Sequence, residues 1–244
     1  MRIAWIVPLL ALLAIVLLLV SGPGVHMGWW TFIVGFKLLK WAAYVGIAAA
    51  VLGILALLIP YTRRGFFVWL VLSIVAGIAV AWVPWHWLQR AHSVPPIHDI
   101  TTDTVNPPQF VAVLPLRKDA ANSAEYGGAK IATQQQAGYP DIKPLHLDLK
   151  PDQAFERALA VAKKMGWTID AAVPAQGRIE ATASTAWFGF KDDVVVRVNA
   201  SGAGSVIDVR SVSRVGESDV GTNAARIRKY LHKVADNGSD GIRG

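Results

Sequence analysis

Hydrophobic positions divide the chain into two parts that differ in pattern. The first part contains three long apolar runs, over residues 3–20, 38–59 and 66–87. An apolar helix of about 20 residues is long enough to cross the hydrocarbon core of a bilayer. We therefore predict three transmembrane helices within residues 1–90, so the chain is expected to be a membrane protein.

The second and third runs predict a helical hairpin. A short polar segment, residues 61–65, separates them and would form a tight turn. Small residues recur at every fourth position on both arms, a spacing that lets two membrane helices approach closely. These residues are Ala42, Gly46 and Ala50 on one arm and Ser73, Gly77 and Ala81 on the other. The alternative is that small residues are simply common in membrane helices.

Basic residues at the ends of the runs bear on orientation. Arg2, Arg63 and Arg64 would lie on one side of the membrane, and an equal number of basic residues on the other. Because cytoplasmic loops are enriched in Lys and Arg, we place the turn and the charged amino terminus in the cytoplasm. This predicts a multi-pass protein of the bacterial inner membrane with a periplasmic carboxyl-terminal domain. The first run lacks a convincing cleavage site, which favours a retained helix over a signal peptide.

Residues 91–140 predict an extended, proline-rich arm that links the membrane part to a domain. Proline pairs at 95–96 and 107–108, a glycine pair at 127–128 and a glutamine run leave no lasting helical or strand period. Such a composition favours extended segments. Turn-fixing Asp and Thr side chains near residues 99–104 favour an arm that wraps the domain.

Residues 141–237 predict the folded domain. A short strand precedes a helix that begins at Pro151 and ends at Gly166, and four strands follow, with turns at 174–177 and 190–193 and a hairpin loop at 201–204. The last helix follows Asp219 and carries an apolar stripe of Val220, Ala224, Ile227, Leu231 and Val234. We predict an α+β fold: transmembrane helices, then a two-layer antiparallel sheet with two helices, similar to a helix-grip arrangement. Residues 238–244 would be a disordered tail.

The charge distribution argues against nucleic acid as a partner. The formal net charge of the chain is +7, but residues 1–97 hold six basic residues and no acidic residue. Residues 98–244 hold the other 18 basic residues and all 17 acidic residues, so the domain is nearly neutral. A nucleic-acid binder should carry a basic face on its folded domain. The excess charge instead fits the flanks of membrane helices.

The absence of certain residues argues against several other classes of function. There is no cysteine, which rules out disulfides, thiol catalysis and cysteine-ligated zinc. No charged residue lies deep within an apolar run, whereas transport and proton relay normally need one. No cofactor is expected.

Several sequence blocks, in order, resemble a known family. They are Tyr-Pro-Asp-Ile-Lys-Pro-Leu at 139–145, Gly-Arg-Ile-Glu-Ala-Thr at 177–182, Trp-Phe-Gly-Phe-Lys-Asp-Asp at 187–193, Asp-Val-Arg-Ser-Val-Ser-Arg-Val-Gly at 208–216 and Ser-Asp-Val-Gly-Thr-Asn-Ala-Ala-Arg-Ile-Arg at 218–228. They resemble the bacterial domain-of-unknown-function family numbered 1499, over roughly residues 97–235. The resemblance implies a membrane-tethered envelope protein and supplies no activity.

Three arginines form the first candidate site. Arg197, Arg210 and Arg214 lie near Asp192, Asp193 and Asp208 on two strands that we expect to pair. Alternate strand residues share a face, so clustered guanidinium groups could bind an anionic ligand or lipid headgroup. The alternative is a ladder of cross-strand ion pairs on a solvated face. Trp187 and its neighbours Phe188 and Phe190 could add a contact site, or could fill the core.

A second candidate set is His98, Asp99 and Asp103. An imidazole beside carboxylates can bind a metal or transfer protons, but this spacing matches no zinc signature. Aspartates here could instead cap turns beside the proline pair at 107–108. No Gly-x-Ser-x-Gly element accompanies the serines near Arg210, and Ser218 or Asp219 fits a helix cap.

These observations favour a non-enzymatic binding module. We expect an envelope protein or an anionic lipid as the partner, bound by the arginine-rich face. The alternative is a metal-dependent or serine hydrolase of the periplasm, which would use His98, Asp99 and Asp103. A weaker third interpretation is a stabiliser of a membrane complex.

Overall fold

The computed structural model describes residues 5–236 and divides into two compact units. The first unit contains the chain up to Arg90 together with Ala186–Gly189, and the second begins at Ala91 and contains the remaining residues. The predicted tail at 238–244 and the first two residues of the first predicted span lie outside the described residues.

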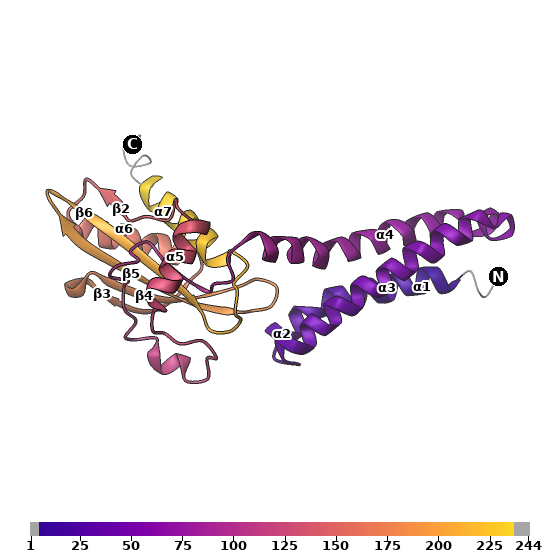
Figure 1. Cartoon of the computed structure of the whole chain (residues 1–244), viewed down its shortest axis with the longest axis horizontal. Coiled ribbons are helices and arrows are strands. Elements are labelled where there is room, and N and C mark those ends of the chain that lie inside the picture. Colours follow the sequence, from indigo (N-terminus) through magenta and orange to yellow (C-terminus); the bar gives the residue numbers. More distant parts are fainter. Residues whose placement is uncertain (1–4, 237–244) are drawn as a thin grey trace. The chain divides into compact units, whose positions relative to one another are not determined.

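The first unit is helical (Figure 1). Its helices are α1 (Ile6–Ser21), α2 (Pro23–His26), α3 (Phe32–Leu58) and the first part of α4 (Pro60–Ser93). Within residues 5–236, three stretches are long and apolar enough to cross a membrane: Ile6–His26, Phe32–Leu58 and Pro60–Ser93. The prediction of three apolar helices is therefore confirmed.

The reversal between α3 and α4 differs from the expected tight turn at 61–65. The chain turns at Ile59, whose backbone is extended, and residues 61–65 are already helical. Pro60 is the first residue of α4, a position where the missing N–H of proline has no intrahelical partner to lose. The Thr62 hydroxyl donates to the Ile59 carbonyl at 2.9 Å. Arg63 and Arg64 are therefore part of the first turns of a helix.

Small residues lie where α3 and α4 cross, as predicted. A Cβ atom added to Gly77 would lie 2.3 Å from the carbonyl oxygen of Gly46, and one added to Gly46 would lie 2.8 Å from the carbonyl oxygen of Gly77. Ala42, Ala50 and Ser73 are buried around this crossing. The two backbones are therefore in direct contact, which larger side chains would prevent.

Replacing Gly77 by leucine is expected to destabilise this crossing. Overpacking a tight contact typically costs about 1–3 kcal/mol, and here the obstructing atoms belong to backbone. Thermal unfolding of the full chain in detergent should show the loss. Gly65→Leu is the matched control, because an added Cβ at Gly65 meets nothing within 4 Å on the same helix. Equal melting temperatures for the two variants would contradict the close helix contact.

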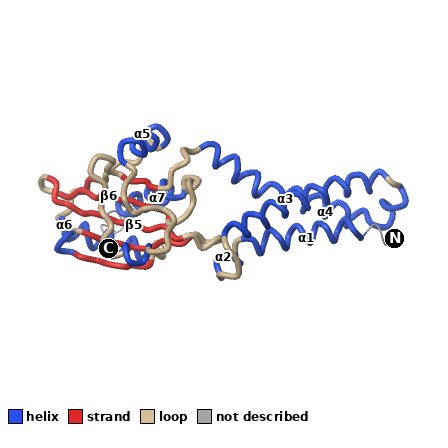
Figure 2. Tube along the Cα trace, turned by 60° about the horizontal axis from the view of Figure 1, so that its bottom comes forward, coloured by secondary structure: helices blue, strands red, loops and turns tan. Residues whose placement is uncertain are grey.

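The second unit is built on one antiparallel sheet (red in Figure 2). Its strands are β1 (Asp99–Thr101), β2 (Leu145–Leu147), β3 (Thr168–Val173), β4 (Arg178–Ser184), β5 (Lys191–Ser201) and β6 (Gly204–Ser213). The order is β1-β6-β5-β4-β3, and β2 pairs with β6 next to β1. The hairpin loop predicted between β5 and β6 is present, and Gly202 supplies its positive φ of 58°.

Two helices, α6 (Pro151–Lys164) and α7 (Thr222–Asp236), cover one face of the sheet. The buried face of the strands is made of alternate apolar residues: Ile179, Ala181, Ala183, Val194, Val196, Val198, Ile207 and Val209. Between the helices, the Trp167 and Tyr230 rings stack with centroids 4.8 Å apart, and the Tyr230 hydroxyl donates to the Ala158 carbonyl. The predicted α+β class is confirmed.

Two local expectations differ from the structure. Residues 191–193, expected as a turn, begin β5, and the turn lies before them, closed by hydrogen bonds between Thr185 and Phe190. Residues 91–140 are not one extended segment, because they contain β1, a 3-10 turn (Leu114–Arg117) and α5 (Gly128–Gly138). The glutamine run lies in α5, where the Gln135 amide pairs with both the N–H and the C=O of Thr101. Gln135 thereby satisfies backbone groups at the edge of β1.

Candidate functional site

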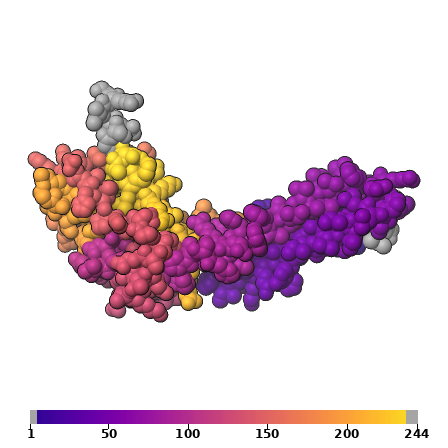
Figure 3. All heavy atoms as spheres, turned by 45° about the horizontal axis from the view of Figure 1, so that its top comes forward, coloured from indigo at the N-terminus to yellow at the C-terminus, as the bar shows by residue number. Residues whose placement is uncertain are grey.

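The sheet face opposite α6 and α7 is polar and is covered by residues 102–127. These residues are the central part of the predicted segment 91–140, and from here on the name arm refers to them alone. Alternate residues of β4, β5 and β6 place charged side chains on this face, and most of them are buried. A small apolar cluster joins arm and sheet: Phe110 and Val113 from the arm, with Val195 and Val212 from the strands. The space-filling view shows arm atoms, in magenta and rose, on the surface of this unit (Figure 3). The arm is thus a layer of the domain.

Arg210, on β6, is fully buried and binds Asp99 at the start of β1. Its Nε and Nη2 atoms donate to the two carboxylate oxygens at 3.0 and 2.8 Å. Nη2 also donates to the carbonyl of Ala124 in the arm at 2.8 Å. The guanidinium lies between the rings of Phe110 and Tyr126, 5.2 and 5.5 Å from their centroids. Burial raises the pKa of Asp99, although the bond to Arg210 opposes that shift.

Glu180, on β4, fixes the backbone of the arm. Its fully buried carboxylate accepts hydrogen bonds from the N–H groups of three consecutive residues, Val111, Ala112 and Val113, each at 3.0 Å. Arg178 also donates to it. Bonds between a carboxylate and N–H donors are stronger than neutral ones. This buried charge is therefore well compensated, and the arm has a defined position.

Asp193, on β5, makes a second charged link to the arm. It accepts from Arg117 of the arm at 2.5 Å and from Arg214 of the segment after β6 at 2.7 Å. Arg117 and Asp193 are both almost completely buried. The Asp193 carboxylate raises the pKa of Arg214. One carboxylate thus ties the arm and the strand end together.

Arg197 completes the set at the other end of β5. It binds Asp208 at 2.8 Å and Asp103 of the arm at 2.9 Å. Partial burial raises the pKa of Asp103, but the N–H groups of Asn106 and Val105 and the Arg197 guanidinium outweigh it, so the pKa is lowered. Asp103 therefore caps a turn beside the proline pair, as one of the two sequence interpretations expected.

The structure brings together most but not all of the predicted arginine site. Arg197, Arg210 and Arg214 share a face with Asp193 and Asp208, as strand alternation predicted. Each arginine already has a carboxylate partner. The pairs therefore match the ion-pair interpretation, but they lie beneath the arm and not on a solvated face. Anion binding by this face stays a prediction.

Neither Asp192 nor Trp187 takes part in the hydrogen bonds and ion pairs of this network. Asp192 points to the helix-covered face, where Arg226 of α7 binds it and also donates to Ser211. Trp187 lies in the part of the β4–β5 loop that belongs to the first unit, and its ring stacks on Phe188 at 6.3 Å. Asp219 caps α7 by accepting from the N–H of Asn223 at 2.7 Å, as expected from the sequence, and its burial raises its pKa.

Sequence reasoning missed Arg117 and Glu180. The signal for Glu180 was present, because it alternates with the apolar residues Ile179 and Ala181 on a predicted strand. Arg117 gave no such signal, since its position in an irregular segment does not reveal which strand it meets.

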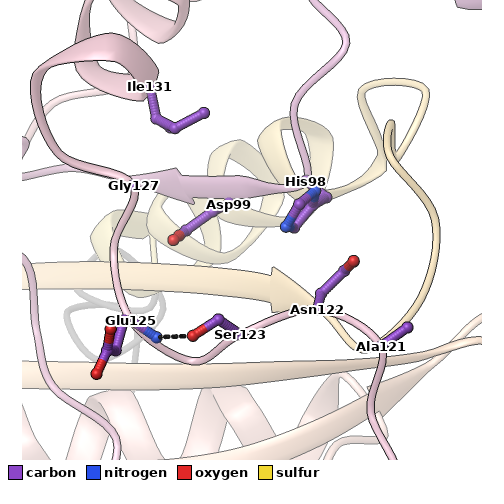
Figure 4. Close-up of a pocket in the computed structure, with 8 residues that line it drawn as sticks. All are labelled: His98, Asp99, Ala121, Asn122, Ser123, Glu125, Gly127 and Ile131. Atoms are coloured by element: carbon purple, nitrogen blue, oxygen red, sulfur yellow. Dashed lines mark hydrogen bonds between the residues drawn. The ribbon is translucent and has the colours of Figure 1, made fainter.

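A shallow pocket of about 310 Å³ opens where the start of β1 meets the arm (Figure 4). His98 and Asp99 line it at the start of β1, and Asn122, Ser123 and Glu125 line it from the arm. The His98 Nδ1 atom lies 3.1 Å from the carbonyl oxygen of Glu217. Asp103, the third member of the predicted set, does not line this pocket. Within residues 5–236, no group of three or more His, Cys, Asp or Glu side chains is arranged to hold a metal ion.

These features define an α+β domain in which the arm covers the polar face of the sheet. In the sequence, three helices able to cross a membrane precede this domain. The chain belongs to the family described as "Protein of unknown function (DUF1499)", whose model matches residues 99–234. This match confirms the resemblance found in the sequence, and it includes the arm as well as the sheet. A search of curated proteins gave no significant match.

Proposed function

We propose that this protein is a membrane-anchored, non-enzymatic binding module that presents the arm to a protein partner. The three apolar helices support anchoring, because each is long enough to cross a bilayer. The basic pair Arg63 and Arg64 supports a cytoplasmic reversal between α3 and α4. With three crossings the domain is then periplasmic, at the inner membrane of a bacterial envelope.

The binding surface is a short apolar segment of the arm, residues 111–116, which we call the tip. Val111, Leu114 and Leu116 are 54, 47 and 51% exposed. Within residues 5–236, every other exposed large hydrophobic residue lies before Ala91 except Val105, which is also on the arm. Single exposed apolar residues are ordinary, but a local group of them marks interaction sites. This clustering on the arm is the observation that carries the proposal.

The tip is held in place on both sides of its exposed side chains. Glu180 holds the N–H groups of residues 111–113, and Arg117 is bound to Asp193 directly after the tip. Holding a loop in one conformation lowers the entropy that binding must overcome. A fixed loop conformation gives little advantage for binding to a fluid lipid surface, but it favours binding to a protein groove of complementary shape. The partner is therefore a protein with an apolar groove.

In this proposal, the arginine-rich face has a structural role and does not bind the partner. An anion that reached Arg197, Arg210 or Arg214 would have to displace a carboxylate that is already bound. Breaking a buried ion pair typically costs several kcal/mol. The face holds the arm in position, and the arm supplies the contact.

A photo-crosslinking residue at position 114 of the full chain, expressed in cells, tests this proposal. We expect one protein adduct of defined mass from position 114 and none from position 160, an exposed site on α6 that serves as the control. Replacing Leu116 by serine should reduce the adduct, because a partly buried leucine contributes about 1–2 kcal/mol to an interface. Adducts with lipid alone, or equal adducts from both positions, would overturn the proposal.

A further inference from the structure

The pocket beside β1 carries a second inference, independent of the tip. Its polar side chains come from two segments that are far apart in sequence, residues 98–99 and 122–125, and the fold holds them against one another (Figure 4). A volume of about 310 Å³ equals that of roughly ten water molecules in the liquid. The pocket can therefore accept a small polar group with part of its carbon chain.

Hydrogen bonds within the domain determine which atoms remain available in the pocket. The carbonyl oxygen of Glu217 can only accept, so the Nδ1 atom of His98 carries the proton and its Nε2 atom is an acceptor in the neutral ring. Both N–H groups of the Asn122 amide serve carbonyl oxygens, of Ser213 at 3.0 Å and Gly216 at 2.8 Å. Its Oδ1 atom is left as an acceptor. Asn122 and the neutral form of His98 thus both offer acceptors.

The charged residues of the pocket also offer hydrogen-bond acceptors. The charge of Asp99 is balanced by Arg210, but each of its oxygens keeps a second lone pair. Glu125 is exposed and makes no ion pair within residues 5–236. The pocket therefore has acceptors on both sides and one uncompensated negative charge. Among these polar side chains of residues 5–236, only Ser123 has a donor that is not already used within the domain, its hydroxyl.

We propose that this pocket binds a primary ammonium group. An –NH3⁺ group has three donors, no acceptor and one positive charge, which complements Glu125, His98 and Asn122. The apolar side chain of Ile131 at the rim suits the methylene carbons next to the nitrogen. The ammonium can belong to a free amine or to an ethanolamine lipid headgroup, and both present the same chemistry.

Ligand-observed NMR on the purified full chain in detergent tests the pocket with ethanolamine and choline. The two molecules differ at nitrogen: choline keeps the charge, but its three methyl groups remove every N–H donor. We expect ethanolamine to bind with a Kd of roughly 1 mM and choline at least about tenfold more weakly, because the acceptors would lose their partners. Equal binding of the two, or no binding of ethanolamine, would overturn the proposal.

Two matched variants separate the pocket from general charge effects. Glu125→Gln should weaken ethanolamine binding by about fivefold, the scale of an exposed ion pair. Glu156→Gln removes an exposed carboxylate on α6 and should leave binding unchanged. Equal effects of the two variants would contradict the proposed site.

Lipid nanodiscs distinguish the two sources of the ammonium group. If phosphatidylethanolamine, but not phosphatidylcholine, suppresses the binding of free ethanolamine, the lipid headgroup is the ligand. If neither lipid suppresses it, the ligand is a soluble amine. If both lipids suppress it equally, recognition of the ammonium donors is refuted.

Discussion

Replacing Arg210 by methionine is expected to lower the free energy of unfolding of the domain by about 3–5 kcal/mol. The variant keeps an apolar side chain between Phe110 and Tyr126 but leaves the buried Asp99 carboxylate without its partner. It also removes the donor to the Ala124 carbonyl, a link between β6 and the arm. Chemical denaturation of the full chain, followed by the circular dichroism of the sheet, measures the loss.

An exposed ion pair in the same domain provides the control. Arg228 binds Asp141 and lies over the ring of Tyr139, so it has the same kinds of contact as Arg210, but its side chain is 44% exposed. Arg228→Met should cost less than about 1 kcal/mol. The double variant Asp99→Asn with Arg210→Met leaves no charge at this buried pair, so much of the loss should be recovered. A double variant as unstable as Arg210→Met would show that the unpaired charge is not the cause.

Apolar periodicity was sufficient to predict the parts of the fold that bury a single face. The three apolar helices follow from run length, and α6 and α7 follow from stripes such as Ala224, Ile227 and Val234. The strands β4 to β6 follow from alternation, which also predicted that Arg210 and Arg214 share a face. In each case the apolar pattern lies within a single helix or strand, so the local sequence is enough to predict that element.

The arm could not be predicted in this way because its structure depends on distant partners. Its apolar residues follow no helical or strand period, and its position is set by hydrogen bonds and ion pairs to strands up to about a hundred residues away, such as those joining Asp103 to Arg197 and Arg117 to Asp193. Irregular backbone has no period that identifies such partners. The turn-rich composition near residues 99–104 indicated that the arm wraps the domain, but not which face it covers.

The same reason explains which part of the candidate site the sequence revealed. Arg197, Arg210 and Arg214 were visible as a group since they alternate on strands. The sequence did not show that the arm covers this face, where each of the three arginines pairs with a carboxylate of the domain itself. The outward-facing tip and the pocket both arise from the arm. In both proposals, the arm therefore determines what the domain binds.

Glu180→Gln is expected to release the tip while the rest of the sheet stays folded. A glutamine has the shape of glutamate, but only one of its two terminal atoms can accept a hydrogen bond. It can serve at most part of the three N–H groups of residues 111–113, and its –NH2 group then faces donors, among them Arg178. Losing bonds to a charged acceptor and leaving buried donors unpaired should cost about 3 kcal/mol locally.

Hydrogen exchange measured by mass spectrometry shows where this energy is lost. The amides of residues 111–113 should exchange at least about tenfold faster in the variant, since 1.4 kcal/mol corresponds to a factor of ten. Amides of β5 and β6 should keep their protection, because those strands pair with each other through ten residue pairs that do not involve Glu180. Glu156→Gln, on the exposed face of α6, is the isosteric control. If residues 111–113 stay protected in Glu180→Gln, the buried carboxylate does not hold the tip, and a protein groove would gain nothing from its presence.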